Sequence, residues 1–478
     1  MADAVPLTRG APEAQGMRSA AIHAFVDAVE RDAHDLHSLM ILRHGHVVAE
    51  GWWAPYGPSS PHMLFSLSKS FTSTAIGMLV AEGRLSVEDP VLSFFPDQAP
   101  AEPSANLRAM RVRDLLTMTT GHAEEPMASI LGQVAVEWTR AFLAQPVQYQ
   151  PGTHFVYNTP ATYMLSAIAQ RITGMRLTEY LTPRLFAPLG IANPVWDVSP
   201  QGIDLGGTGL NVTTEAIARF GQLYLQKGMW QGARLLPESW IEQATTRQVD
   251  NGSAPDSDWE QGYGYQFWRC RHGAYRGDGA FGQFCVALPA QEAVVAITSG
   301  LSAMQPVLDL VWQHLLPAMG PEPLAEDTAA QEALTARLAG LRLRPQQGGT
   351  TSPTAARVAG QTFVVAENED RIGAIRFDIE DQGAMLTLHN AYGEQRIPCG
   401  AATWARGRAA IERPTPWPVA TSGAWTDDQT YVAQLWWYET PFKRTLTCRF
   451  EGDRLRVEQQ VNVAFGPTER PLLNGRLA

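Results

Sequence analysis

Residues 62–72 read HMLFSLSKSFT, and Ser66 stands three positions before Lys69 in this run. From Ser68 to Glu82 apolar side chains recur at helical spacing and proline is absent, which predicts a helix with Ser66 at its N-terminus. Residues three apart share one face of a helix, so we expect the Ser66 hydroxyl and the Lys69 amine to meet. The run therefore predicts a serine paired with a lysine.

The pairing matters because a serine is a poor nucleophile until a base takes its proton. A lysine is such a base only when burial or the positive end of a helix dipole lowers its pKa. Backbone N–H groups at the same helix end can hold a developing oxyanion. The alternative is an ordinary N-cap serine beside a solvated lysine.

Lysine is rare in this chain, which has three lysines, Lys69, Lys227 and Lys443, and 34 arginines. With so few lysines, a serine three residues before one of them arises by chance with a probability of roughly 0.2. Arginine cannot lose its proton in a protein, so a lysine at position 69 fits a group that must do so.

Composition restricts the class of protein. The 478 residues predict two or three units, and 45% hydrophobic with 18% charged residues indicates globular units with a sizeable core. The net charge of −11 argues against nucleic-acid and anionic-membrane partners. Four widely spaced cysteines and the absence of an H-E-x-x-H motif predict neither a disulfide framework nor a metal site. The chain also lacks G-x-S-x-G and G-x-x-x-x-G-K-[ST], which argues against an α/β-hydrolase and a P-loop NTPase.

The start of the chain gives a prediction of location. Residues 1–7 lack the basic start and apolar run of a signal peptide, and no 18-residue apolar stretch follows. We therefore expect a cytoplasmic protein.

Strand and helix patterns predict an antiparallel sheet covered by helices, an α/β fold. A helix (18–32), a hairpin (39–50) and the Ser66 helix come first, and a mostly helical region follows at about 87–200. Further patterns predict helices at 161–173, 213–225 and 304–318 and strands at 262–269, 274–278, 283–289 and 293–298. The sheet would be assembled from both ends of this segment, with the helical region inserted.

The composition changes after the Gly-Pro-Glu-Pro run at 320–323. A helix at about 328–339 and a loose Gly- and Pro-containing run at 345–353 follow, and residues 355–478 carry many short strand-like stretches separated by turns. Such a pattern predicts an all-β barrel or sandwich of roughly 120 residues. We expect three segments: 1–322, a helix and linker at 323–353, and a β domain at 354–478.

Two further stretches carry candidate site residues. Tyr157 lies in a polar segment before a predicted helix, and a phenol beside a cationic lysine has a lowered pKa and can transfer protons; the alternative is a half-buried core tyrosine. The glycine-rich run 277–283 can approach a substrate closely and offer a backbone N–H to an oxyanion; the alternative is a plain β-turn. We expect His62, His122 and His154 to be structural or surface residues.

Residues 12–300 resemble the serine β-lactamase and penicillin-binding-protein superfamily, in particular the class C β-lactamase-related hydrolases. The resemblance rests on the order and spacing of FSLSKSF (65–71), DLLTMTTGH (114–122), PGTHFVYNT (151–159) and GAFGQF (279–284). It implies a β-lactamase/transpeptidase-like fold, Ser66 as the acylated nucleophile, Lys69 as its base partner and Tyr157 as the second proton-transfer group. It implies no metal and no organic cofactor.

This chain departs from the family pattern at two positions. The Tyr-x-Asn motif appears as Tyr157-Asn158-Thr159, and the Lys-Thr-Gly or His-x-Gly motif appears as Asp278-Gly279-Ala280. A cation at 278 would hold a substrate carboxylate, whereas Asp278 would repel one. We therefore expect weak or no β-lactamase activity, and substrates with a neutral or amino-bearing group near Asp278. The expected substrate-binding residues are Thr159, Asp278, Gly279 and Phe281.

The β-rich C-terminal segment is similar to the small lipocalin-like domains of some members of this group, on strand pattern alone. Such a domain would shape the mouth of the site or mediate assembly, so an oligomer is possible. For the chain we expect hydrolysis of a small ester, amide or peptide through an acyl-enzyme on Ser66. Acyl transfer to an alcohol or amine, and a ligand sensor without turnover, are the alternatives.

Overall fold

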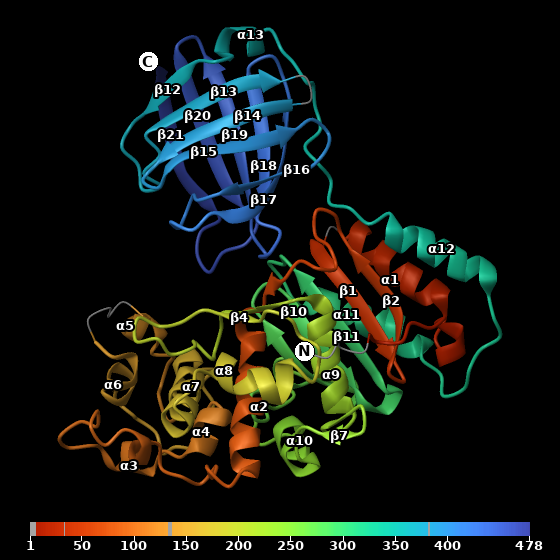
Figure 1. Cartoon of the computed structure of the whole chain (residues 1–478), viewed down its shortest axis with the longest axis vertical. Coiled ribbons are helices and arrows are strands. Elements are labelled where there is room, and N and C mark those ends of the chain that lie inside the picture. The colour runs from red at the N-terminus through yellow and green to blue at the C-terminus, as the bar shows by residue number, and fades with distance from the viewer. Residues whose placement is uncertain (1–5, 33, 132–135, 381–382) are drawn as a thin grey trace. The chain divides into compact units, whose positions relative to one another are not determined.

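The computed structural model of the chain describes residues 6–32, 34–131, 136–380 and 383–478 (Figure 1). Contacts divide the chain into two units. Unit 1 comprises Met1–Gly51, Pro61–Ser299 and Ala303–Ala339, and unit 2 comprises Trp52–Ser60, Gly300–Ser302 and Gly340–Ala478. Residues 1–5, which bear on the predicted lack of a signal peptide, lie outside the described residues. No helix in the described part is long and apolar enough to span a membrane.

The sheet of unit 1 has six strands in the order β2-β1-β11-β10-β9-β8. Its strands are β1 (Leu36–Arg43), β2 (His46–Trp52), β8 (Trp268–Arg269), β9 (Tyr275–Gly279), β10 (Gln283–Leu288) and β11 (Ala293–Ser299). The pairings β1–β11, β11–β10, β10–β9 and β9–β8 are antiparallel. The early hairpin thus joins strands more than two hundred residues away, as predicted, and the helical region is inserted between them.

One strand prediction was too long. The stretch 262–269 forms strand only at β8, because Gln266 adopts a left-handed backbone with a φ of 65° that interrupts an extended chain. The Gln266 side chain donates to the carbonyls of Leu115 and Leu116 at 3.1 and 2.8 Å, so the kink also fixes the inserted helical region.

Helices lie on both faces of the sheet, and the residues of β1, β9, β10 and β11 are accordingly buried throughout. In Figure 1 α1 and α12 lie on one side, and α2 and α9 lie on the other. The helices of unit 1 are α1 (Ser19–Arg31), α2 (Ser68–Ala81), α3 (Ala105–Ala109), α4 (Val112–Leu116), α5 (Met127–Leu131), α6 (Trp138–Leu143), α7 (Thr159–Thr173), α8 (Leu177–Leu181), α9 (Thr214–Leu225), α10 (Glu238–Thr245), α11 (Gln305–Leu310) and α12 (Thr328–Ala339).

Helix α2 carries the Ser66 segment into the core. Ser66 lies in a single 3-10 turn, η2 (Phe65–Leu67), that leads directly into α2. Phe71 of α2 stacks on Phe220 of α9 with ring centroids 3.9 Å apart. Such stacking adds to the burial of two large apolar side chains, so α2 is held firmly against the helix that covers the sheet.

Unit 2 contains a closed β-barrel, as the strand pattern predicted. Its strands run in the order β15-β14-β13-β12-β21-β20-β19-β18-β17-β16, and a parallel pairing of Gly400 in β15 with Ser422 in β17 closes nine of them. The strands are β12 (Thr362–Val365), β13 (Ala374–Glu380), β14 (Gly383–Asn390), β15 (Gly393–Gly400), β16 (Ala405–Ala409), β17 (Trp417–Trp425), β18 (Thr430–Trp436), β19 (Lys443–Glu451), β20 (Arg454–Val461) and β21 (Glu469–Leu477).

The barrel follows from strict alternation along its strands. In β20 every second residue is buried, because successive side chains of a strand point to opposite faces. The inward faces meet in an aromatic core in which Phe450 contacts Phe377 and Trp425, with ring centroids 5.1 and 5.6 Å apart. The segment Trp52–Ser60 belongs to this unit through bonds such as that from Tyr56 Oη to the Thr440 carbonyl at 2.8 Å.

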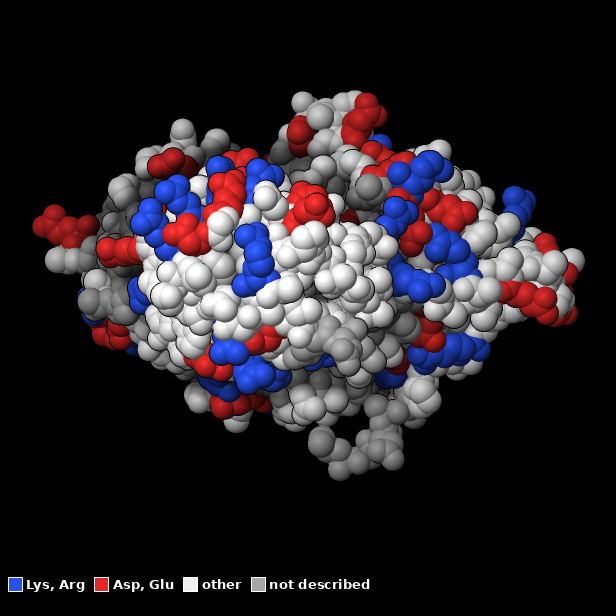
Figure 2. Space-filling view, turned by 90° about the horizontal axis from the view of Figure 1, so that it is seen from above, with Lys and Arg blue, Asp and Glu red and all other residues white. Residues whose placement is uncertain are grey.

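The net negative charge lies in unit 1. That unit holds 21 Lys and Arg against 33 Asp and Glu, whereas unit 2 holds 16 against 15. On the face drawn in Figure 2, acidic and basic side chains are interspersed.

Candidate active site

The turn that carries Ser66 is strained and closely packed. Phe65 has a φ of 48°, in the left-handed region that costs a bulky residue of order 1–3 kcal/mol. Its ring meets that of Phe281, with centroids 5.3 Å apart and planes at 88°. Strand β9 runs directly beside the turn, since a Cβ on Gly279 would lie 2.0 Å from the Leu64 carbonyl oxygen. Only glycine permits this approach.

Lys69 is placed as the sequence predicted. Its Nζ lies 3.0 Å from Ser66 Oγ, 2.8 Å from the Gly207 carbonyl and 3.3 Å from Thr159 Oγ1. The side chain is 1% exposed, and burial lowers its pKa to about 7, against smaller opposite effects of Glu125 and Asp278. At neutral pH a large fraction of Lys69 is therefore an amine that can take the Ser66 proton.

Tyr157 lies over the same pair. Lys69 Nζ is 4.9 Å from the centroid of its ring, and its hydroxyl shares a hydrogen bond with Ser66. The predicted direction of its pKa shift was wrong: burial, followed by the charge of Asp278, raises the pKa of Tyr157 well above its usual value. The expectation failed because sequence could show the neighbouring lysine but neither the burial of the phenol nor the position of the Asp278 carboxylate near it.

Thr159 Oγ1 faces Lys69, and Asn158, the residue before it, holds the local backbone in place. Asn158 caps α7, its Oδ1 accepting from Ala161 N at 3.1 Å, while its Nδ2 donates to Thr120 Oγ1 at 3.2 Å. His122 Nδ1 lies 2.8 Å from the same Thr120 hydroxyl, and burial lowers the pKa of His122 to about 4. The Thr-Thr-Gly-His run thus supports the Tyr157 segment, and a role of Thr159 towards substrate stays a prediction.

The other two histidines named in the sequence analysis, His62 and His154, are buried and exposed respectively. His62 is buried, its Nε2 is 3.0 Å from His37 Nδ1, and burial lowers its pKa to about 4. His154 is exposed and lies against the ring of Tyr149. In the described part of the chain, no three His, Cys, Asp or Glu residues come together as metal ligands.

Asp278 does not stand as a free anion. Arg276 Nε donates to Asp278 Oδ2 at 2.8 Å, and the two side chains are 0% and 6% exposed. Burial raises the pKa of Asp278, and the charge of Arg276 opposes this shift. Sequence singled out Asp278 but missed Arg276, although a side chain two residues away on a strand points to the same face.

Glu125 is a second carboxylate at the site that sequence analysis missed. Its Oε1 accepts from Thr159 N at 2.7 Å, and its charge raises the pKa of both Lys69 and Tyr157. Unlike Asp278, Glu125 is exposed. It lies in the loop between α4 and α5, 34 residues before Thr159, and no periodic pattern predicts where such a loop folds back.

The chain matches known proteins in sequence and in fold. The family model described as beta-lactamase matches residues 26–305, more than half of the chain. The 6-aminohexanoate-dimer hydrolase of Paenarthrobacter ureafaciens is 25% identical over 278 residues, which cover 54% of this chain and 71% of that protein. A putative D-alanyl-D-alanine carboxypeptidase of Salmonella agona is 22% identical over 224 residues, and the match spans 41% of this chain and 52% of that protein.

Solved structures share the fold. The octameric penicillin-binding protein homologue of Pyrococcus abyssi has a TM-score of 0.52 at 16% identity, covering 96% of this chain and 99% of its own. The putative 6-aminohexanoate-dimer hydrolase of Bacillus anthracis has a TM-score of 0.53 at 21% identity, covering 65% and 86%. The extent of the family match and the hydrolase relatives lead to one conclusion: the chain belongs to the beta-lactamase family, within the serine β-lactamase and penicillin-binding-protein superfamily.

Proposed function

We propose that the chain is a serine hydrolase that cleaves a small ester or amide through an acyl-enzyme on Ser66. The observation that carries the proposal is Lys69, buried with a pKa of about 7 and 3.0 Å from Ser66 Oγ. As Ser66 Oγ attacks the substrate carbonyl, Lys69 Nζ accepts its proton, and the leaving group departs with a proton from the enzyme. Water then attacks the ester on Ser66 and releases the acid.

The backbone at η2 and at the turn after β9 supplies the oxyanion donors in this proposal. Ser66 lies in η2, the 3-10 turn that leads into α2, and Phe281 lies in the turn that β9 brings against Phe65. Backbone N–H groups of Ser66 and of a residue near Phe281 would hold the negative oxygen of the tetrahedral intermediate. Such donors need no reorganisation during the reaction, because the packing of both turns already fixes them.

Weak β-lactamase activity is part of the proposal. A penicillin carries a carboxylate, and binding it would call for an accessible cation near position 278. Arg276 is the cation of this strand, but it is fully buried and donates to Asp278, to the Asp258 carbonyl and to Cys270 Sγ. The exposed Glu125 adds a negative charge beside Lys69 and Tyr157. Substrates with a neutral or amino-bearing group are therefore favoured over carboxylates.

Steady-state hydrolysis of p-nitrophenyl acetate tests the proposal. Turnover that is lost in Ser66→Ala supports it, and turnover unchanged in that variant contradicts it. Adding methanol or a primary amine separates hydrolysis from acyl transfer, since a transferase yields the methyl ester or the amide in place of acetate. A cephalosporin hydrolysed as efficiently as the ester, with no change in Glu125→Gln, would contradict the proposed charge preference.

A further inference from the structure

The surface of the barrel in unit 2 carries a groove of about 690 Å³ in which arginines gather. The groove lies over β12, β21, β20 and β19. Its lining includes four arginines and one carboxylate, namely Arg449, Arg454, Arg456, Arg476 and Glu451. Unit 2 as a whole is close to neutral, with 16 Lys and Arg against 15 Asp and Glu. Four of the 16 cations therefore lie in one groove, which holds one of the 15 acids.

The strand register places these arginines opposite one another. Arg454 of β20 is paired with Arg476 of β21, and Arg456 of β20 is paired with Arg449 of β19. Exposed and buried residues alternate along β20, so Arg454 and Arg456 both point away from the barrel core. Like charges that face each other across two strands destabilise the pairing of those strands. The barrel thus contains two unfavourable pairs on neighbouring strands.

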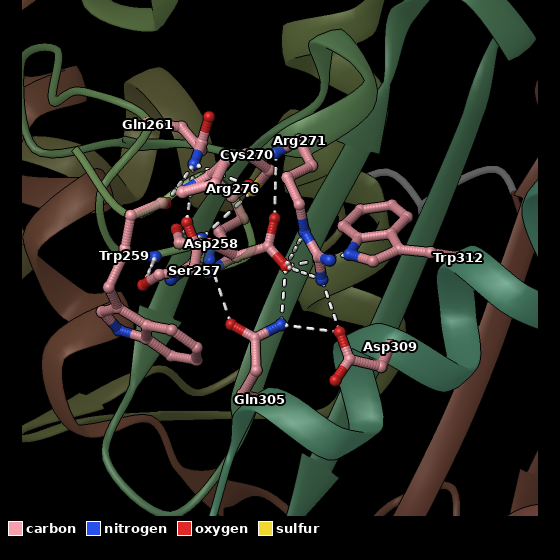
Figure 3. A network of polar contacts seen from close by, with 12 residues as sticks. Ser257, Asp258, Trp259, Gln261, Cys270, Arg271, Arg276, Gln305, Asp309 and Trp312 are labelled. Atoms are coloured by element: carbon pink, nitrogen blue, oxygen red, sulfur yellow. Dashed lines mark hydrogen bonds and ion pairs between the residues drawn. The ribbon is translucent and has the colours of Figure 1, made fainter.

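The surroundings of these arginines differ from those of Arg271 in unit 1, which Figure 3 shows. Arg271 Nη2 lies 2.8 Å from Asp258 Oδ2 and also contacts Asp309 Oδ1. Asp258 Oδ2 accepts further hydrogen bonds from Gln305 Nε2 at 2.8 Å and from Trp312 Nε1 at 2.9 Å. The charge of Arg271 is therefore matched by carboxylates of the protein itself.

One arginine of the groove has a comparable partner. Arg456 Nη2 lies 3.1 Å from Glu458 Oε1. Within the described part of the chain, Arg449, Arg454 and Arg476 form neither an ion pair nor a side-chain hydrogen bond. Each guanidinium carries five N–H donors in a planar fork that suits a carboxylate. The groove therefore presents three guanidinium groups whose donors are available to an anionic ligand.

The spacing of the arginines indicates an extended chain as that ligand. Residues two apart on a strand lie about 6.6–6.8 Å apart, so Arg454 and Arg456 repeat with the period at which alternate side chains of an extended peptide repeat. Apolar side chains also line the groove, because Val364 and Leu477 belong to it and are 55% and 43% exposed. A peptide can contact both the guanidinium groups and the apolar side chains, whereas inorganic phosphate can use the guanidinium groups alone.

We propose that the groove binds an extended acidic segment of a partner protein, with carboxylates at alternate positions. The carboxylates accept hydrogen bonds from Arg454 and Arg456 and from the arginines that face them, Arg476 and Arg449, and this relieves both like-charge contacts. The groove lies in unit 2 and Ser66 lies in unit 1. The site therefore adds a binding function to the hydrolysis proposed above and does not depend on it.

Fluorescence anisotropy of a labelled Gly-Glu-Val-Glu-Val-Glu-Gly peptide, titrated with the full chain, tests the proposal. We expect saturable binding that weakens as the salt concentration rises, because salt screens exposed charges. The peptide with glutamine in place of each glutamate should not bind. Equal binding of the two peptides would overturn the proposal, since the second lacks the charge. Competition by inorganic tripolyphosphate at the concentration of the acidic peptide itself would overturn the peptide as the ligand.

Arginine variants test the location of the site. Arg454→Gln combined with Arg476→Gln should weaken binding of the acidic peptide about tenfold or more, because charge-assisted hydrogen bonds to both residues are lost. Arg396→Gln is the matched control, since Arg396 on β15 is also exposed but is paired with Thr387 of β14. The control should bind as the wild type does. Equal losses in the double variant and in the control would contradict the groove as the site.

Thermal unfolding separates binding from a structural role of the arginines. Removing one of two facing arginines relieves a repulsion, so the Tm of Arg454→Gln should equal or exceed that of the wild type. A lowered Tm would mean that the arginine stabilises the barrel, which contradicts the proposal. Arg449→Gln disrupts the other pair and provides an independent check, since it should also weaken binding of the acidic peptide without lowering the Tm.

Two further measurements identify the occupant and separate the two proposals. Sedimentation velocity over a range of protein concentrations detects self-association. Self-association of the wild type that is lost in the Arg454→Gln/Arg476→Gln variant would make the occupant a second copy of this chain, and would contradict a different partner. Ser66→Ala should bind the acidic peptide as the wild type does, whereas its hydrolysis should be lost. Loss of peptide binding in Ser66→Ala would contradict an independent site, and surviving hydrolysis would contradict only the proposed reaction.

Discussion

Two strands of this protein carry the same Arg-x-Asp pair in opposite surroundings. On β9, Arg276 and Asp278 are 0% and 6% exposed, and on barrel strand β13, Arg376 and Asp378 are 46% and 32% exposed. Nε to carboxylate distances are 2.8 Å in the first pair and 3.0 Å in the second. Burial changes the consequence: the pKa of Asp278 is raised by desolvation, and its charge reaches Lys69 and Tyr157. The same Arg-x-Asp pair is thus exposed in one unit and buried beside the candidate active site in the other.

The largest expected effect concerns the buried lysine. Lys69→Arg keeps the positive charge but cannot release its proton, so kcat/KM for p-nitrophenyl acetate should fall by about 10³-fold or more. Lys443→Arg on barrel strand β19 is the matched control and should leave the rate unchanged, since its ammonium lies over the Trp436 ring and arginine stacks there equally well. A near-normal rate in Lys69→Arg would contradict Lys69 as the base and would remove the expected difference between Lys69 and Lys443.

Removing the arginine of each pair compares their contributions to stability. Arg276→Met leaves a buried carboxylate without its partner and should lower the free energy of unfolding by about 3–5 kcal/mol. Arg376→Met breaks an exposed pair and should cost about 0–1 kcal/mol. Urea unfolding of both variants measures the difference, and equal losses would show that burial does not separate the pairs.

Gly279 allows a second comparison, between a glycine that another backbone segment approaches closely and a glycine in open space. Gly279→Ala places a Cβ 2.0 Å from the Leu64 carbonyl, so β9 must shift away from the Ser66 turn. A displacement of that size near the reacting atoms should lower kcat/KM about 10²-fold. Gly466→Ala in unit 2 meets no atom within 4 Å and should have no effect. Normal kinetics in Gly279→Ala would mean that the turn and β9 are not coupled in this way.

The smallest expected effect is the change of kcat/KM with pH in the wild-type protein. Lys69 has a pKa of about 7, and only its neutral form accepts a proton, so kcat/KM should fall about tenfold per pH unit below pH 7. Burial and Asp278 raise the pKa of Tyr157 above 10, so no alkaline limb is expected below that pH. A profile that is flat between pH 5 and 9 would contradict Lys69 as the base.

The contrast also explains what sequence could predict. The barrel could be predicted because apolar and polar residues alternate along strands such as β20. The helix after Ser66 could be predicted because its apolar residues recur at helical spacing and it contains no proline. The pair Ser66 and Lys69 was predictable because one helical turn joins the two residues. Tyr157 was singled out by the polar segment before a predicted helix and the run 277–283 by its glycines, and the order of the motifs supported both predictions.

The surroundings of the site were not predictable, because they depend on long-range burial. Whether a carboxylate such as Asp278 is free or paired, and whether the pKa of a phenol such as Tyr157 rises or falls, is decided by groups distant in sequence. Glu125 reaches Thr159 from a loop without periodicity. Arg276 is the exception, because its position two residues before Asp278 on one strand could have predicted that the two side chains lie on the same face.

The measurement that tests the central claim most directly is intact-mass spectrometry of the protein during reaction with p-nitrophenyl acetate. We expect a transient gain of one acetyl group on Ser66 in the wild type, accompanied by continuous release of acetate. Neither should appear in Ser66→Ala or Lys69→Ala. A persistent adduct without turnover would indicate a ligand sensor, and an acetylated, active Ser66→Ala protein would contradict the site described above.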